Sequence, residues 1–201
     1  MMYFLDFDRT LFDTDAYNAS LADEPGCAPF REDILKVLSQ KRDDTLVPPA
    51  ERARVWGLVS EAIKSGALSF PPGYLERFLY ADVAETLRSL GNEAVIITYG
   101  EEARQRLKIE SALANAVRVT VLYTGDLSKA NYLSSWPGYY GQEAAMVEDR
   151  TAELEALAEK FPKMKLFKIE RGARPPQSIE GAPSFESEGR WKTIHSLAEL
   201  P

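Results

Sequence analysis

The sequence has little cysteine, little histidine and no long apolar run. Cys27 is the single cysteine, so no disulfide can form within the chain. A cytoplasmic location is the expectation for such a chain. No apolar run approaches the roughly 20 residues that a membrane-spanning helix needs. The N-terminus lacks the basic region of a signal peptide. No membrane partner is therefore expected.

Basic clusters are scarce as well. The formal net charge is −7 at pH 7, and the longest basic run is Lys41-Arg42. A nucleic-acid partner, which calls for a basic face, is therefore not expected. The one histidine, His195, is expected in a C-terminal helix as a surface or packing residue. Acid–base chemistry would then fall to carboxylates.

The chain does contain enough apolar side chains for a core. Of its 201 residues, 45% are hydrophobic and 27% are charged, as in an ordinary globular protein. This length accommodates one well-buried core and a smaller module.

Four apolar runs end in polar residues suited to phosphoryl transfer. Such short runs predict buried parallel strands, and ligands bind beyond the carboxyl ends of such strands. The runs and the polar residues that follow them are 3–5 before Asp6-Phe7-Asp8-Arg9-Thr10, 94–97 before Thr98-Tyr99-Gly100, 117–123 before Lys129, and 144–147 before Glu148-Asp149. Carboxylates, a hydroxyl and a lysine would thus meet at one edge, as a magnesium-assisted attack on a phosphate ester requires.

Helical and strand patterns alternate outside residues 15–80, which predicts an α/β fold with a doubly wound parallel sheet. Expected helices cover 81–90, 101–113, 129–135, 151–161 and 191–200, and expected strands cover 93–98, 117–123, 144–148 and 164–169. Residues 171–190, rich in Pro, Gly and Ser, are expected to be irregular.

Residues 15–80 interrupt this alternation. They contain no convincing strand, and helices are expected over 31–41, 50–64 and 74–80. The sequence therefore predicts an α/β core of residues 1–14 and 81–201, with residues 15–80 as a helical insertion. By itself, this pattern is compatible with a plain helical extension without a substrate role.

The motif Asp6-x-Asp8-x-Thr10, followed by Thr98, Lys129 and Glu148-Asp149, resembles the four motifs of the haloacid dehalogenase (HAD) superfamily of hydrolases. The resemblance implies a HAD-like Rossmannoid core and a small helical cap domain formed by 15–80. Arg9 departs from the pattern, since many phosphatases of the family carry glycine there. It is expected to affect only substrate contacts or loop shape.

The resemblance also implies roles for the acidic residues. Asp6 is the expected nucleophile, forming an aspartyl phosphate. Asp8 would protonate the leaving alcohol and then activate water. The expected ligands of Mg²⁺ are Asp6, Asp8, Glu148 and Asp149, with Asp149 binding directly and Glu148 more often through water. The substrate phosphate would be bound by Thr98, Tyr99, Gly100 and Lys129, with Lys108 as a competing lysine.

The sequence thus favours a magnesium-dependent phosphatase acting on a small phosphorylated metabolite. A phosphomutase or another phosphotransferase shares these motifs and stays open, as does a HAD-like binding or scaffold protein without significant turnover. A dehalogenase needs no metal, and family members of that kind lack the second aspartate of the first motif, so Asp8 together with Glu148-Asp149 argues against it. The substrate and the oligomeric state stay open.

Overall fold

The computed structural model describes residues 1–39, 48–115, 118–139, 143–172 and 189–201. The chain divides into two compact units. The sheet unit comprises Met1–Phe12, Tyr80–Tyr99 and Ala116–Pro201, and the helical unit comprises Asp13–Leu79 and Gly100–Asn115. Among the described residues, no helix is both long enough and apolar enough to cross a membrane.

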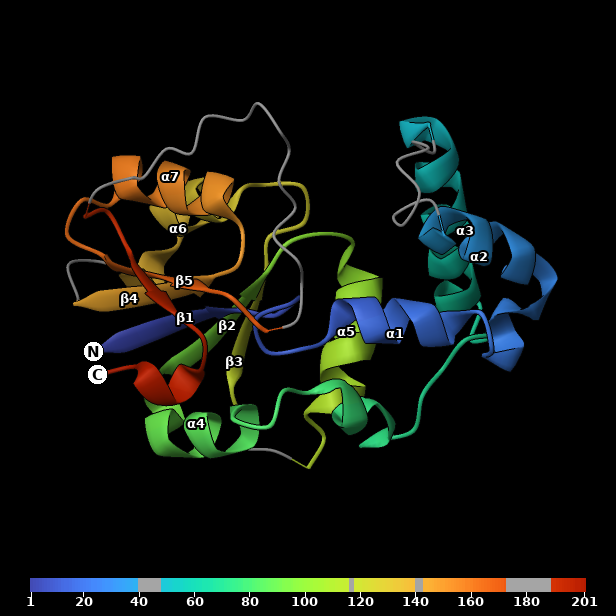
Figure 1. The fold of residues 1–201 in the computed structure, drawn as a ribbon, viewed down its shortest axis with the longest axis horizontal. Coiled ribbons are helices and arrows are strands. Elements are labelled where there is room, and N and C mark those ends of the chain that lie inside the picture. Colours follow the sequence, from blue (N-terminus) through green and yellow to red (C-terminus); the bar gives the residue numbers. More distant parts are fainter. Residues whose placement is uncertain (40–47, 116–117, 140–142, 173–188) are drawn as a thin grey trace. The chain divides into compact units, whose positions relative to one another are not determined.

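The sheet unit contains a six-stranded sheet in the order β3-β2-β1-β4-β5-β6, and every neighbouring pair is parallel. The strands are β1 (Met2–Asp6), β2 (Ala94–Thr98), β3 (Thr120–Tyr123), β4 (Ala144–Glu148), β5 (Lys165–Ile169) and β6 (Lys192–Ile194). Helix α4 (Val83–Leu90) covers one face, and α6 (Lys129–Ser135) and α7 (Thr151–Lys160) cover the other (Figure 1). The predicted doubly wound sheet is confirmed.

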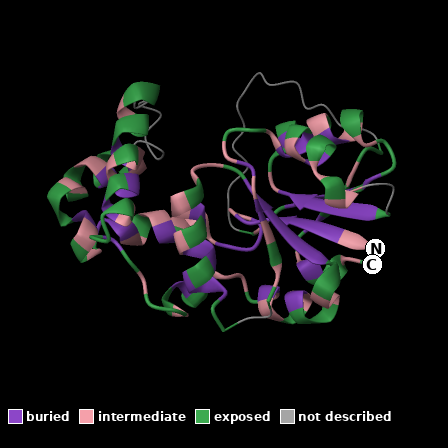
Figure 2. Ribbon diagram, turned by 180° about the vertical axis from the view of Figure 1, so that it is seen from behind, coloured by how far each residue is buried: buried purple, intermediate pink, exposed green. Residues whose placement is uncertain are grey.

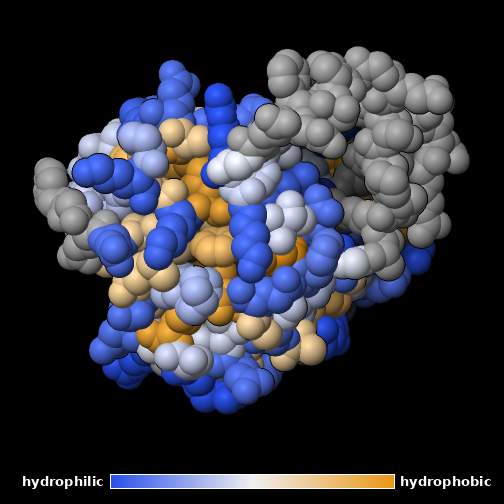
Figure 3. Space-filling view, turned by 60° about the vertical axis from the view of Figure 1, so that its left-hand side comes forward, coloured by the Kyte–Doolittle hydropathy of each residue, from blue (hydrophilic) through white to orange (hydrophobic). Residues whose placement is uncertain are grey.

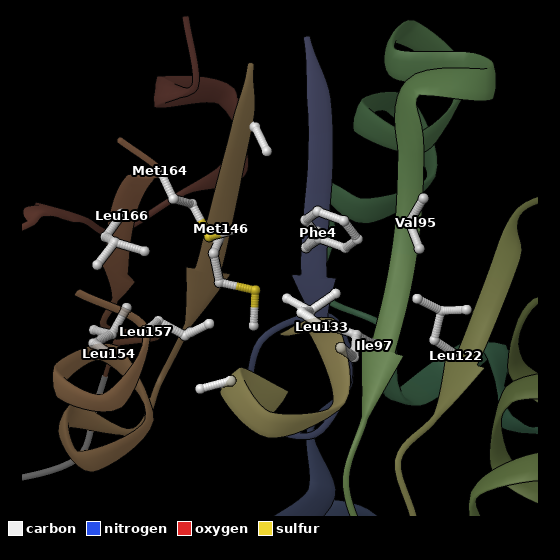
Figure 4. Packing of buried hydrophobic residues seen from close by; sticks show 12 residues of the cluster. Phe4, Val95, Ile97, Leu122, Leu133, Met146, Leu154, Leu157, Met164 and Leu166 are labelled. Atoms are coloured by element: carbon white, nitrogen blue, oxygen red, sulfur yellow. The ribbon is translucent and has the colours of Figure 1, made fainter. Parts of the chain in front are cut away.

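The central strands are buried on both faces (Figure 2), which explains why their sequences are almost continuously apolar. On the face covered by α6 and α7, alternate strand residues form one cluster with both helices (Figure 4). Phe4 of β1 and Met146 of β4 lie opposite each other in the sheet and belong to this cluster. Leu133 brings α6 into the same cluster, which fixes the place of this short helix.

The predicted C-terminal helix over 191–200 is wrong. Lys192–Ile194 forms β6, which pairs with β5, and a 3₁₀ turn follows at Leu197–Glu199. Ser196 and Glu199 form a reciprocal capping box at this turn. Backbone pairing with β5 thus outweighs the local helical pattern. His195 accordingly lies between a strand and a turn. Of the irregular stretch 171–190, residues 173–188 lie outside the described part.

The helical unit contains α1 (Thr14–Leu21), α2 (Arg31–Ser39), α3 (Pro49–Lys64) and α5 (Glu102–Ala112). Helix α1 was not predicted, although the Asp13 side chain caps it by accepting from the Ala16 N–H at 3.0 Å. Residues Tyr74–Phe78 form a 3₁₀ turn where a helix was expected.

Helix α5 groups with the helical unit even though it follows β2 in sequence. The Gly73 N–H donates to the Ser111 carbonyl, and the Ser111 hydroxyl donates to the Pro71 carbonyl, each at 2.8 Å. The structural units therefore differ from the predicted division, which placed 101–113 in the core. A capping role for 15–80 stays a prediction.

The surface view shows mostly hydrophilic side chains, with apolar ones gathered between them near its centre (Figure 3). A hollow of about 890 Å³ lies beside α7 and is lined in part by Phe161, Met164 and Leu166. None of the predicted site residues lines this hollow. The candidate site has to be sought at the ends of the strands.

Candidate active site

Asp6 and Glu148 are the last residues of β1 and β4, the strands between which the sheet order reverses. Phe4 and Met146 lie opposite each other, and Asp6 and Glu148 each lie two residues further along the same strands. Because side chains alternate between faces with a period of two, both carboxylates are on the face that α6 covers. Lys129, the first residue of α6, reaches them from that side.

Lys129 is buried and bridges the two carboxylates. Its Nζ donates to Asp6 Oδ1 and to Glu148 Oε2, and only 1% of the residue is exposed. Its backbone N–H donates to Glu153 Oε2 at 3.2 Å. Burial favours the neutral amine, but the charges of Asp6 and Glu148 outweigh it and raise the pKa of Lys129. The ammonium group is therefore held charged at the centre of the site.

Asp149 completes an acidic cluster with Asp6 and Glu148. One carboxylate oxygen from each of the three lies within 4.8 Å of the others. Burial raises the pKa of Asp6 well above its ordinary range, and the charges of Glu148 and Asp149 add to this. Burial and then Glu148 raise the pKa of Asp149 to about 7. Because the three carboxylates share a single lysine ammonium group, a further positive charge would stabilise their ionised forms.

The cluster fits a divalent cation. Asp6 Oδ2 is buried and has no hydrogen-bond partner among the described residues. Both oxygens of Glu148 are engaged, one by Lys129 and the other by the Arg150 N–H at 3.0 Å. Asp6 thus offers an available oxygen, with the Asp149 carboxylate beside it in the cluster, and Mg²⁺ prefers such hard oxygen ligands. Asp8 is not one of the three, and its place among the metal ligands stays a prediction.

The loop after β1 turns tightly. The N–H groups of Leu11 and Phe12 both donate to the Phe7 carbonyl at 3.0 Å, and the Arg9 N–H donates to the Phe12 carbonyl at 2.7 Å. Arg9 has a φ of 66°, in the left-handed region that favours glycine. Glycine would therefore adopt this backbone conformation at lower cost than arginine does. Asp8, half-buried, forms an isolated β-bridge with Phe12.

The left-handed conformation of Arg9 predicts a difference between two substitutions. Arg9→Gly should be more stable than Arg9→Ala by about 1 kcal/mol, since only alanine keeps the steric cost of positive φ. Both variants lose the same side-chain interactions, so their comparison isolates the backbone. Urea unfolding of both proteins measures the difference, and equal midpoints with equal slopes would contradict the assigned conformation.

Three of the four predicted phosphate-binding residues lie at the carboxyl end of β2. Thr98 is buried at the end of that strand, and its Oγ1 has no hydrogen-bond partner among the described residues. Tyr99 is exposed, with the Arg150 guanidinium 5.9 Å from its ring centroid. Gly100 has a φ of 111°, which favours glycine. The phosphate-binding roles of Thr98, Tyr99 and Gly100 stay predictions.

The two candidate lysines lie in different units. Lys129 contacts Asp6 directly, whereas Lys108 is buried in α5 of the helical unit. The structure therefore brings together Asp6, Lys129, Glu148 and Asp149 from the residues that were predicted to form the site.

Solved structures share this architecture at low sequence identity. A protein described as a haloacid dehalogenase-like hydrolase from Burkholderia xenovorans LB400 has a TM-score of 0.65 and 20% identity, covering 97% of this chain and 92% of its own. A dehalogenase in an intermediate complex has a TM-score of 0.55 and 18% identity, covering 99% and 94%. A haloacid dehalogenase-like family hydrolase from Xanthomonas campestris has a TM-score of 0.54 and 10% identity, covering 98% and 90%.

The chain has a haloacid dehalogenase-like fold. A scan against protein-family models and a search of curated proteins give no match. At these identities the likeness concerns the fold alone.

Sequence reasoning missed two residues around the candidate site of this haloacid dehalogenase-like fold. Glu153, in the first turn of α7, accepts from the Lys129 N–H. Arg171 donates two hydrogen bonds to the Thr10 carbonyl. A signal for Arg171 was present, because it follows the end of β5 by two residues and therefore belongs to the same edge of the sheet.

Proposed function

We propose that the protein is a magnesium-dependent phosphatase of the HAD superfamily that hydrolyses a small phosphorylated metabolite. The observation that carries the proposal is the buried Lys129 between Asp6 and Glu148, with Asp149 beside them. A nucleophilic carboxylate, a fixed cation and oxygen ligands for a metal are the groups that phosphoryl transfer through an aspartyl phosphate requires.

In this mechanism Asp6 is the nucleophile, and Asp8 acts twice, first as an acid and then as a base. A carboxylate oxygen of Asp6 attacks phosphorus, the bond from phosphorus to the alcohol oxygen breaks, and Asp8 gives its proton to that oxygen. Asp8 then takes a proton from water, and the resulting hydroxide displaces Asp6 and yields inorganic phosphate. Splitting one displacement into two easier steps lowers the barrier, and general acid–base catalysis contributes about 10²–10⁴-fold.

The remaining groups orient the nucleophile and neutralise the negative charge of the phosphoryl group. Lys129 holds the Asp6 carboxylate through Oδ1 and places a positive charge where the phosphoryl oxygens gain negative charge. The Thr98 hydroxyl, which no other described residue engages, is suited to donate to one of those oxygens. Mg²⁺, held by Asp6 and Asp149 with Glu148 behind them, would supply further charge neutralisation. Residues 15–80 are assigned as a substrate-selecting cap because of their place after the first motif.

A metal-dependent turnover screen tests the proposal. Phosphate release from phosphorylated sugars, nucleotides and amino acids should occur with Mg²⁺, stop with EDTA and return when Mg²⁺ is restored. Ca²⁺ should support it poorly, because its longer and looser coordination misplaces the reacting groups.

The same screen distinguishes the alternatives. Halide release from haloacids in EDTA would instead identify a dehalogenase. Transfer of the phosphoryl group within a substrate, without free phosphate, would identify a mutase. Binding without any turnover in Mg²⁺ would identify a scaffold or binding protein.

A further inference from the structure

Arg171 contacts the backbone of the first motif. Its Nε and Nη2 donate to the Thr10 carbonyl at 2.9 and 2.7 Å, and its Nη1 donates to Asp82 Oδ2 at 2.6 Å. The guanidinium carbon also lies 4.4 Å from the centroid of the Tyr80 ring. The forked guanidinium thus joins the motif loop, which follows β1, to the segment that begins α4. All four residues belong to the sheet unit.

Asp82 holds Arg171 in place. Its Oδ2 also accepts from the Ser196 hydroxyl and the Leu197 N–H, each at 2.8 Å. Burial alone would raise the pKa of Asp82, but the hydrogen bond from Arg171, with those from Leu197 and Ser196, lowers it. The side chains of Arg171 and Asp82 are only 10% and 18% exposed. This pair is therefore shielded from water and fixed on several sides.

The contact matters because the motif loop is strained and short. Arg9 has a left-handed backbone, and the loop closes through the N–H groups of Leu11 and Phe12 on the Phe7 carbonyl. Thr10 is fully buried, and a buried carbonyl without a partner is costly. Arg171 supplies both hydrogen bonds to this carbonyl and so defines the orientation of the peptide that leaves Thr10.

We propose that Arg171, held by Asp82, is a positioning residue for the first motif: by fixing the Thr10 carbonyl, it keeps the loop in the shape that aims Asp8 at the leaving group. Asp8 lies two residues before Thr10, so rotation of the loop backbone would displace its carboxyl group. The catalytic part of this proposal rests on the proposed phosphatase function. The loop-fixing part stands on geometry alone.

Arg171→Met and its matched control Arg88→Met, which removes an exposed arginine of α4, test the catalytic part. Substrates are phenyl phosphate, with a poor leaving group, and p-nitrophenyl phosphate, with a good one. Misplacing the acid should lower kcat for phenyl phosphate by about ten- to a hundredfold. The loss for p-nitrophenyl phosphate should be several times smaller, because its leaving group needs less protonation. Arg88→Met should match the wild type on both.

Two results would overturn the positioning role. Equal losses on the two substrates would mean that Arg171 affects only the fraction of enzyme that is folded. No loss on either substrate would mean that the contact does not contribute to turnover. Arg171→Lys, which keeps the charge but cannot form the fork, should lie between wild type and Arg171→Met. If Arg171→Met does not fold, Asp82→Asn should give the same substrate dependence with a smaller loss.

Hydrogen exchange tests the loop independently of turnover. The Leu11 and Phe12 amides should exchange faster in Arg171→Met, or in Asp82→Asn, than in the wild type and Arg88→Met. Unchanged exchange would overturn the proposal, whatever reaction the protein catalyses. A wild type that hydrolyses no phosphate ester, combined with faster exchange of these amides, would instead contradict the proposed function and retain the loop-fixing role.

Discussion

Asp6→Asn is expected to abolish phosphate release while the sheet unit stays folded. The amide is a poor nucleophile and lacks the negative charge that binds a metal, so the rate should fall by at least about 10³-fold, in the range seen when a catalytic nucleophile is removed. Asparagine has nearly the same volume, so the packing around Phe4 and Lys129 should not change.

The stability of Asp6→Asn should differ little from that of the wild type. Burial disfavours the charge of Asp6, as its raised pKa shows, so removing that charge offsets part of the pairing lost by Lys129. We expect the free energy of unfolding to change by less than about 2 kcal/mol.

Initial rates in Mg²⁺ and urea unfolding of the same preparations measure both effects. Asp126→Asn is the matched control, since Asp126 is an exposed acid in the loop before α6 and should keep the full rate. Retention of more than a few per cent of the rate by Asp6→Asn would rule out Asp6 as the nucleophile.

Lys129→Met is expected to lose both turnover and stability. The substitution leaves Asp6, Glu148 and Asp149 crowded together without their central cation. Removing one partner from a buried charge network costs about 3–5 kcal/mol. Turnover should fall by about 10²-fold or more, because the cation that neutralises the phosphoryl group is gone.

The stability deficit of Lys129→Met should depend on pH and metal. The pKa values of Asp6 and Asp149 are already raised on folding, and loss of the ammonium group raises them further. The folded variant then binds more protons than the unfolded chain, so its stability falls as pH rises. The deficit should be smallest in acid and grow as pH rises through the neutral range, where Lys129 of the wild type is still charged, and Mg²⁺ should reduce it.

Urea unfolding across the pH range, with Mg²⁺ or EDTA, tests this behaviour. Lys129→Arg keeps the charge and should retain most of the stability. Lys108→Met is the discriminating control, because Lys108 was the competing lysine and lies in the helical unit. Loss of turnover in Lys108→Met, with Lys129→Met active, would reverse the assignment of the catalytic lysine.

The sequence predicted the candidate site best where a polar residue stands at the end of a buried strand. The apolar runs before Asp6, Thr98 and Glu148 give strands that end at these residues. Parallel pairing then brings those ends to one edge, and α6 begins at Lys129 as expected. The apolar pattern and the observed strands agree at these positions, because a short continuous apolar run is best buried as a central strand that is covered on both faces.

Other features depend on partners far away in the chain. The segment that forms β6 reads as a helix by itself and becomes a strand only because β5 offers an edge. Arg171 and Asp82 are separated by 89 residues, so no local pattern indicates their ion pair. Helix α5 lies between β2 and β3 in the sequence, as a helix of the sheet unit would. It nevertheless packs in the helical unit, through contacts such as that of Ser111 with Pro71.

The most direct test of the central claim is to trap the aspartyl phosphate. The wild type is mixed with its best substrate from the turnover screen and Mg²⁺, quenched in acid during turnover, digested and analysed by mass spectrometry. The account predicts a phosphoryl group on Asp6, absent in EDTA and absent from Asp6→Asn. Magnesium-dependent turnover with the phosphoryl group on another residue, or on none, would contradict it.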